Sequence, residues 1–315
     1  MYREFRYQTL VKLAKLVTPG PISAGIAKQY NITDISPTDP KAGKEFKPAS
    51  ISVPNPGKGS VRVMAPPNYG VQGNQVNIVF HFRGAGSGAI YSKAGTNAVV
   101  VAVDAPGVGG GGMAPYGNAQ FINAAQGSVL AQVRKITGNP NLQLGNISYV
   151  GWSGGYDPMG RLFEGKQWNQ LQKKPVHVAM LDGGHYGKAG QPNPKRMQPW
   201  VEVAQRARDG ELEFFFTHSA VTPGRSERFP QGYASTTDSA NYLLEQMQMQ
   251  RQPSAGVASR ADAGGFHVIQ LYDEQAPYKI RDPKTGRMRA NIPGTSGYQH
   301  IDALRRAPEV LPTWG

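Results

Sequence analysis

Residues 146–155 read Asn-Ile-Ser-Tyr-Val-Gly-Trp-Ser-Gly-Gly, a short apolar run that leads directly into the pattern Gly-x-Ser-x-Gly. This pattern is typical of a nucleophile elbow, a sharp strand-to-helix turn that exposes one serine above the carboxyl edge of a sheet. Gly151 and Gly155 flank Ser153, and a Cβ at either position is expected to clash across the turn. The pattern alone is weak in a chain with 39 glycines. Its context, a β-favouring run before it and a helical pattern after it, predicts an elbow rather than an ordinary glycine-rich turn.

The composition restricts the class of protein. A chain of 315 residues with 39% hydrophobic residues can bury a large core, which predicts one elaborated α/β domain. The chain has no cysteine, which excludes disulfides, thiolate metal sites and a cysteine nucleophile. Its net charge of +13 favours anionic surroundings such as an envelope or a polymer. Lysine and arginine are spread along the whole chain without a dense basic run, so we expect no specific nucleic-acid recognition.

The amino-terminal part is expected to belong to the same domain as the core, with residues 1–74 as an entry segment and residues 75–315 as the core. Residues 1–17 have apolar positions at helical spacing with basic residues between them, which predicts an amphipathic helix. A signal peptide and a transmembrane segment are not expected, because no long apolar run is present. The compartment stays open between the cytoplasm and export after removal of a leader. Ala49–Val53 and Ser60–Met64 indicate an antiparallel entry to the sheet.

From residue 75 onwards, apolar runs alternate with helical patterns, as parallel βαβ units require. The predicted strands are Asn77–Phe82, Ala98–Asp104, Ile147–Val150, Val176–Leu181, Leu212–Thr217 and Phe266–Tyr272. The predicted helices are Phe121–Ile136, about 158–171, Gln198–Arg208, Thr236–Met249 and one that begins near His300. Ser235 is a plausible N-cap, with Asp238 three residues on. These patterns predict an α/β protein with a mostly parallel central sheet and helices on both faces.

A nucleophilic serine needs a base to take its proton and an acid to orient that base. The six histidines of the chain are His81, His177, His185, His218, His267 and His300. His300 alone follows the last predicted strand, where the base of such triads lies, so it is the candidate base. His81 lies within a predicted strand and is expected to be a buried structural histidine.

Two aspartates compete for the role of the acid. Asp182 directly follows the strand Val176–Leu181, and the two glycines after it let the chain turn sharply. Asp273 lies just beyond the last predicted strand, in a long polar loop. The tight turn favours Asp182.

The oxyanion hole is expected to combine two backbone N–H groups. One belongs to Gly154, directly after the nucleophile. The second comes from the loop after the strand Asn77–Phe82, where the donor is Ala85 or Gly84.

Several aromatic and imidazole side chains are candidates for substrate binding. His185 could line the site. His218 and the hydroxyls of Thr217 and Ser219 end a predicted strand on the presumed active edge, where they either support the site or are simply structural. The aromatic candidates are Trp152, Tyr116, Tyr186 and Tyr298.

No metal or cofactor is expected. Asp182, His185 and His218 could be imagined around zinc, but no HExxH or comparable ligand spacing is present. The glycine-rich run 107–113 lacks the Lys-Ser/Thr of a phosphate loop. It is interpreted as a mobile loop near the entrance of the site.

The chain resembles the α/β-hydrolase superfamily in the elbow 151–155, the loop 81–85 and the late His300. More narrowly, it resembles a little-characterised group of bacterial hydrolase-like proteins. The matching segments are Leu181-Asp-Gly-Gly-His185, Thr217-His-Ser219, Gly232-Tyr-Ala-Ser-Thr-Thr237, Gly264-Gly-Phe-His-Val268 and His300-Ile-Asp-Ala-Leu304. The resemblance covers roughly residues 75–310 and implies Ser153, Asp182 and His300 as the triad. The acid falls one strand earlier than is usual in the superfamily, a placement that some lipases share.

These expectations favour a serine hydrolase that cleaves a carboxylic ester through an acyl-enzyme. Two alternatives stay open. The same triad also serves amide hydrolysis, for example of cell-wall peptides or N-acyl groups. The fold could also carry a binding module without catalysis.

Overall fold

The computed structural model describes residues 55–65, 69–71, 73–83, 91, 94–105, 111–219, 232–255, 257–271, 279–281, 288–290 and 310–314. The expected amphipathic helix 1–17, the strand-like piece Ala49–Val53 and the helix near His300 lie outside the described residues.

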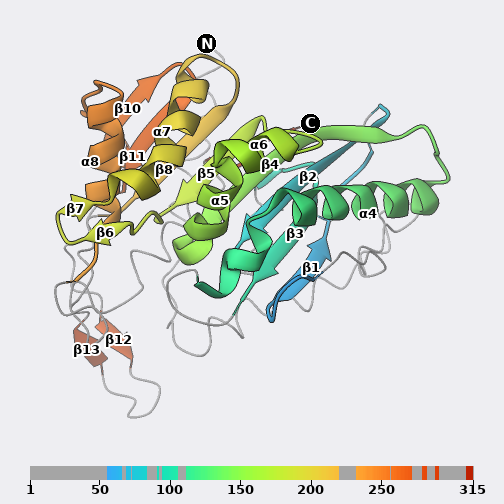
Figure 1. Cartoon of the computed structure of the whole chain (residues 1–315), viewed down its shortest axis with the longest axis horizontal. Coiled ribbons are helices and arrows are strands. Elements are labelled where there is room, and N and C mark those ends of the chain that lie inside the picture. Colours follow the sequence, from blue (N-terminus) through green and yellow to red (C-terminus); the bar gives the residue numbers. More distant parts are fainter. Residues whose placement is uncertain are drawn as a thin grey trace.

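A nine-stranded sheet forms the centre of the described part, in the order β1-β3-β2-β4-β5-β8-β11-β10-β9 (Figure 1). Its strands are β1 (Ser60–Met64), β2 (Gln75–Phe82), β3 (Val99–Asp104), β4 (Gln143–Trp152), β5 (His177–Leu181), β8 (Glu213–His218), β9 (Gln252–Ser254), β10 (Val257–Ala263) and β11 (Phe266–Gln270). The strands from β3 across to β11 pair in parallel, whereas β1 and the β10–β9 end are antiparallel. Two small sheets join β6 (Gly187–Lys188) to β7 (Gln191–Pro192) and β12 (Lys279–Arg281) to β13 (Met288–Ala290). The expected mostly parallel sheet is confirmed, and so is the antiparallel entry strand Ser60–Met64.

Three of the five α-helices among the described residues begin at a residue whose side chain caps the first turn. They are α4 (Ala119–Thr137), α5 (Tyr156–Phe163), α6 (Gly165–Gln170), α7 (Pro194–Arg208) and α8 (Thr236–Gln246), with 3₁₀ turns η3 (Gly111–Tyr116) and η4 (Ser153–Gly155). Asn118 caps α4 through the N–H of Phe121, and the helix ends at Gly138 in the left-handed region (φ 69°). The predicted N-cap Ser235 is confirmed, because it forms a full capping box with Asp238.

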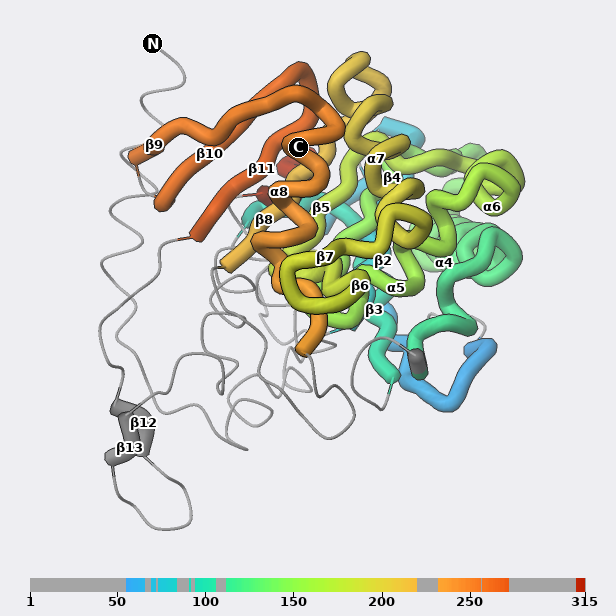
Figure 2. Tube along the Cα trace, turned by 60° about the vertical axis from the view of Figure 1, so that its left-hand side comes forward, coloured from blue at the N-terminus to red at the C-terminus, as the bar shows by residue number. Residues whose placement is uncertain are grey.

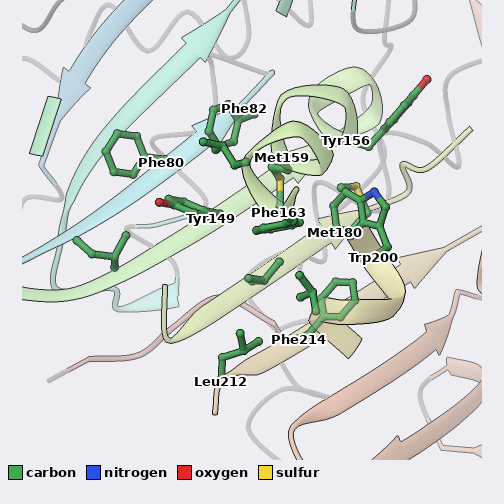
Figure 3. Packing of buried hydrophobic residues seen from close by; sticks show 14 of the residues in the cluster. Phe80, Phe82, Tyr149, Tyr156, Met159, Phe163, Met180, Trp200, Leu212 and Phe214 are labelled. Atoms are coloured by element: carbon green, nitrogen blue, oxygen red, sulfur yellow. The ribbon is translucent and has the colours of Figure 1, made fainter. Parts of the chain in front are cut away.

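The two faces of the sheet are covered differently. One face carries the main core, in which helices α4 to α8 pack on the strands. Figure 3 shows Met159 and Phe163 of α5 and Trp200 of α7 among the residues that fill this interior. The second face has its own cluster, to which Tyr91, Ala94 and the segment 310–314 contribute. Tyr91 and Ala94 have helical backbone conformation and pack on the second face, so residues in helical conformation cover both faces of the sheet.

The structure differs from the sequence predictions at three places. The predicted helix 158–171 is two helices, because Glu164 has an extended ψ of 130° between α5 and α6. Part of the loop expected over 107–113 is the turn η3, in which Met113 is fully buried. The strands β10 and β9 were not predicted, since β10 is rich in small and polar residues (VASRADA). They extend one end of the sheet beyond β11, as Figure 2 shows.

Two buried histidines should make the protein less stable in acid. His81 lies 2.6 Å from the hydroxyl of Tyr91 through Nδ1, as a structural histidine should. His177 donates Nε2–H to the carbonyl of Val310 (2.8 Å) and accepts from Ser148 through Nδ1 (2.7 Å), so it is neutral. Burial lowers the pKa of each imidazole from 6.5 to about 4. The unfolded chain therefore binds more protons between these values, and stability falls as the pH drops from about 6.5 towards 4.

Urea unfolding at pH 7.5 and pH 4.5 measures this effect, which we expect to be about 3 kcal/mol for each histidine. The variant His177→Gln keeps an N–H for Val310 but cannot titrate. It should lose less stability between the two pH values than the unmodified chain. An equal loss in both proteins would mean that His177 does not titrate in this range.

Candidate active site

The carboxyl ends of β2 and β4 meet at the point where the strand order reverses. The chain passes from β2 to β3 on one side and then places β4 on the other side. In open α/β sheets, ligands bind outside the carboxyl ends of the strands at such a reversal. Phe82 pairs with Gly151, and Trp152 pairs with Leu181, so the ends of β2, β4 and β5 are level. The residues that follow these strands therefore share one edge of the sheet.

Ser153 stands at this edge on a strained turn. Strand β4 ends at Trp152, which is still extended, and helix α5 begins only four residues later at Tyr156. Ser153 itself has a φ of +51°, which places a residue with a side chain in the left-handed region. Such strain costs about 1–3 kcal/mol and persists where the surroundings enforce it. The predicted strand-to-helix turn at Ser153 is confirmed.

The glycines around Ser153 have the steric role that the sequence predicts. A Cβ on Gly151 would lie 2.4 Å from the sulfur of Met159, and one on Gly155 would lie 2.2 Å from the carbonyl oxygen of Phe82. The second contact also shows that the end of β2 presses against the elbow. A serine at positive φ between a parallel strand and a helix, with a glycine two residues before and two residues after it, is the defining turn of one α/β architecture.

The chain has the α/β-hydrolase fold. No protein-family model matches it, and no curated protein matches it. Among solved structures it is similar to an esterase 2 from Thermogutta terrifontis (13% identity, 85% of this chain and 92% of that chain, TM-score 0.37). It is also similar to an acetyl xylan esterase from Aspergillus awamori (8% identity, 69% and 88%, TM-score 0.37). A siderophore hydrolase from Aspergillus nidulans matches at 11% identity over 68% and 83%, with a TM-score of 0.38. Because these TM-scores are below 0.5, the assignment rests on the strand order and the elbow of the chain itself.

Of the two expected N–H donors of the oxyanion hole, one lies among the described residues and the other does not. Gly154, whose N–H is the first expected donor, is buried in η4 directly before helix α5. This N–H belongs to the amino-terminal turn of a helix, where the helix dipole favours negative charge. Arg83 begins the loop after β2 with a φ of +67°. Gly84 and Ala85 lie outside the described residues, so the second donor stays a prediction.

Asp182 follows β5 and lies at the strand end next to the elbow. It has a φ of +47°, and its side chain is almost fully buried. The next residue, Gly183, is so close to the elbow that a Cβ there would lie 2.8 Å from the carbonyl oxygen of Ser153. The turn after β5 therefore packs against the elbow, and the buried side chain of Asp182 belongs to that turn. The rival Asp273 lies outside the described residues.

His218, at the end of β8, is buried beside Asp182 in a neutral form. Its Nε2 accepts from Arg251 (2.9 Å), and its Nδ1 lies 3.1 Å from the hydroxyl of Thr237. Burial, and then the charge of Arg251, lower the pKa of His218 to about 4. With both nitrogens bonded inside the protein, His218 is built into the support of Asp182.

His185 lies on the turn that follows Asp182 and is partly exposed. Its Nδ1 donates to the carbonyl of Ala234 (3.0 Å), which puts the lone pair of the neutral imidazole on Nε2. The rings of Tyr156 and Tyr233 meet its ring edge-on at 6.1 Å and 5.1 Å. Figure 3 shows the hydroxyl of Tyr156 directed away from the core. His185 stays a candidate for substrate contact.

A second serine–histidine pair, Ser148 with His177, does not belong to this site. Ser148 is fully buried within β4, and it pairs in register with His177 at the first position of β5. Asp182 follows the opposite end of the same strand. The outer nitrogen of His177 bonds to the carbonyl of Val310, whereas a triad base needs a carboxylate behind it.

Two of the aromatic candidates for substrate binding, Tyr116 and Tyr186, are buried and bonded within the protein. The hydroxyl of Tyr116 binds Gly59 and Asn55, and the ring is fully buried. Tyr186 is likewise buried. Its hydroxyl donates to the carbonyl of Tyr156 (3.0 Å) and accepts from the indole of Trp200 (3.2 Å).

Trp152 is partly exposed and packs on the second face of the sheet. Tyr298 and the candidate base His300 lie outside the described residues. The role of His300 therefore stays a prediction.

In the part of the chain that the structure describes, no group of three or more His, Asp or Glu side chains lies close enough to hold a metal ion. No helix among the described residues is long and apolar enough to cross a membrane.

Sequence reasoning considered the hydroxyl of Ser219 as support for the active edge, but it missed Thr236 and did not connect either residue with Asp182. Ser219 and Thr236 both bond to its carboxylate, although they lie 37 and 54 residues further along the chain. A signal for them existed, because Ser219 closes the segment Thr-His-Ser at a strand end and Thr236 opens a capped helix. Neither pattern indicates which carboxylate accepts the hydrogen bond from the hydroxyl of Ser219 or of Thr236.

Proposed function

We propose that this protein is a serine hydrolase that cleaves carboxylic esters through an acyl-enzyme intermediate. Ser153 is the nucleophile, His300 the general base and Asp182 the acid that orients the imidazole. The observation that carries the proposal is the strained Ser153 on the elbow, against which the turn that begins with the buried Asp182 packs. Strain at a polar side chain on the ligand-binding edge of a sheet is typical of a catalytic residue.

The reaction proceeds in two balanced halves. The hydroxyl oxygen of Ser153 attacks the ester carbonyl while His300 takes the hydroxyl proton, and the N–H groups of Gly154 and of Ala85 or Gly84 bind the oxyanion. The C–O bond to the alcohol then breaks, and the imidazolium returns its proton to the leaving alcohol. In the second half water replaces the alcohol, and the acid product leaves with Ser153 restored. Asp182 holds the tautomer of His300 and stabilises its cationic form.

The charge of the chain bears on the substrate class. A net charge of +13 raises the local concentration of anionic partners. We therefore place the ester in an anionic polymer or envelope. If this is right, hydrolysis of an ester carried on such a polymer should slow as the salt concentration rises, whereas that of a neutral ester should not.

Labelling with a fluorophosphonate probe tests the nucleophile. We expect one covalent adduct on the peptide that contains Ser153, and no adduct in Ser153→Ala. Ser148→Ala is the matched control, because it removes a buried serine that also bonds to a histidine, and it should still be labelled. An absence of adduct in the folded chain would contradict the proposal and favour a binding module. Turnover of p-nitrophenyl esters against peptide anilides then separates ester from amide hydrolysis.

A further inference from the structure

The carboxylate of Asp182 is held by three short hydrogen bonds from two other elements. Its Oδ1 accepts from the backbone N–H of Ser219 (2.9 Å) and from the hydroxyl of Thr236 (2.6 Å). The hydroxyl of Ser219 lies 3.0 Å from Oδ1 and 2.9 Å from Oδ2. All three residues are at least nine-tenths buried, so the carboxylate is oriented from inside the protein.

A second layer of bonds fixes Ser219 itself. Its carbonyl accepts from the hydroxyl of Thr237 (2.8 Å), and the hydroxyl oxygen of Thr236, whose proton goes to Asp182, lies 3.2 Å away. Behind Thr237 stand His218 (3.1 Å) and then Arg251 (2.9 Å from His218). Arginine can only donate, so Nε2 of His218 accepts, and its Nδ1–H donates to Thr237. Each hydrogen bond in this series therefore has a defined donor: Arg251 donates to His218, His218 donates to Thr237, and Thr237 donates to the carbonyl of Ser219.

The start of helix α8 is fixed as well, which places both threonines. The hydroxyl of Ser235 accepts from the N–H of Asp238 (3.0 Å), and the carboxylate of Asp238 accepts from the N–H of Ser235 (2.7 Å). The same carboxylate accepts from Gly190 (3.1 Å). Thr236 and Thr237 are the first two residues of the capped helix, so their hydroxyls come from a rigid turn.

We propose that Thr236, Ser219 and His218 are positioning residues that hold the Asp182 carboxylate in the one orientation in which it can accept the N–H of the catalytic imidazole. The inference rests on the proposed function and assigns residues beyond the triad. The terminal torsion of an aspartate is broad, so an unbonded carboxylate would rotate. Donors at defined places remove that freedom, and a displacement of about 1 Å in such a site costs about 10²-fold in rate.

The pair Thr236→Val and Thr236→Ser tests the inference. Valine keeps the shape and removes the hydroxyl, whereas serine keeps the hydroxyl. We expect kcat of Thr236→Val to fall about 10²-fold with KM nearly unchanged, and Thr236→Ser to stay close to the unmodified enzyme. The apparent pKa of the rising limb of kcat/KM should also move down in Thr236→Val, because a misplaced carboxylate stabilises the imidazolium less. Ser219→Ala, which keeps its backbone N–H donor, should change both quantities in the same direction by less.

A double-mutant cycle separates positioning from a merely structural role. If Thr236 acts through Asp182, then Thr236→Val should cause almost no further loss of kcat in an Asp182→Asn background. An equal loss in both backgrounds would overturn the inference, as would an unchanged kcat and pH profile in folded Thr236→Val.

Failure of the proposed function gives a different result. In that case the unmodified chain neither reacts with the fluorophosphonate nor hydrolyses any ester. The positioning inference fails alone when the unmodified chain is labelled and active but the Thr236 variants are indistinguishable from it.

Discussion

The Ser153→Ala variant is expected to lose ester hydrolysis almost completely, with kcat lower by about 10⁶-fold, as in serine hydrolases that lack their nucleophile. The reason is that no other hydroxyl stands on a strained turn at the carboxyl edge among the described strands. The substitution removes one oxygen and keeps the Cβ, so the strain at φ +51° is unchanged. The free energy of unfolding should therefore change by no more than about 0.5 kcal/mol. Steady-state kinetics and urea unfolding of the same preparation measure both quantities.

Ser148→Ala provides the opposite phenotype as a control. It leaves Nδ1 of the buried His177 without its hydroxyl partner, which should cost about 1–3 kcal/mol of stability. Because this pair lies away from the edge where the strands end, turnover should be retained. Activity in Ser153→Ala, or its loss in folded Ser148→Ala, would remove the elbow from the mechanism.

The Asp182→Asn variant is expected to lower kcat by about 10⁴-fold, the loss measured when the acid of a triad becomes an amide. An amide is neutral, so it cannot stabilise the imidazolium that forms when the base takes the proton of Ser153. The amide must also turn its oxygen towards the donors of Ser219 and Thr236 at the Oδ1 position, which puts its N–H₂ group at the Oδ2 position, where our proposal needs an acceptor for the N–H of the base. That group would select the wrong tautomer of the imidazole.

Two further aspartates serve as controls for Asp182. Asp157 is also buried, but it forms ion pairs with Arg161 (3.2 Å) and Arg196 (2.9 Å) on helices α5 and α7. Asp157→Asn should therefore lower stability and leave most of the turnover. Asp273→Asn should have no effect on kcat. If the large loss occurs in Asp273→Asn and not in Asp182→Asn, our assignment of the acid is wrong.

Much of the architecture could be predicted because its signals are local. The predicted strand Asn77–Phe82 and the helix Thr236–Met249 recur as β2 and α8 with shifts of only a few residues at their ends. The break between α5 and α6 was missed, since the hydrophobic pattern continues across it. Strand β10 was missed because it is rich in small and polar residues, and its place depends on pairing with β11 and β9.

By itself, the sequence determined the elbow, because the demands of that turn act within five residues. The turn through Ser153 excludes a side chain at 155, where a Cβ would lie 2.2 Å from the backbone oxygen of Phe82, and it favours glycine at 151, where a Cβ would press on the sulfur of Met159. The capping of α8 is local in the same way.

Only the tertiary structure decided what surrounds Asp182. Ser219 and Thr236 meet its carboxylate because β5 and β8 are neighbours in the sheet and α8 begins above them. Polar side chains of this kind follow many strands and open many helices, and a hydrogen bond forms only between groups that the fold brings within about 3 Å. Sequence spacing carries no measure of that distance, so the chain alone marks Asp182 and Ser219 as polar residues at strand ends but does not show that they bond to each other and to Thr236.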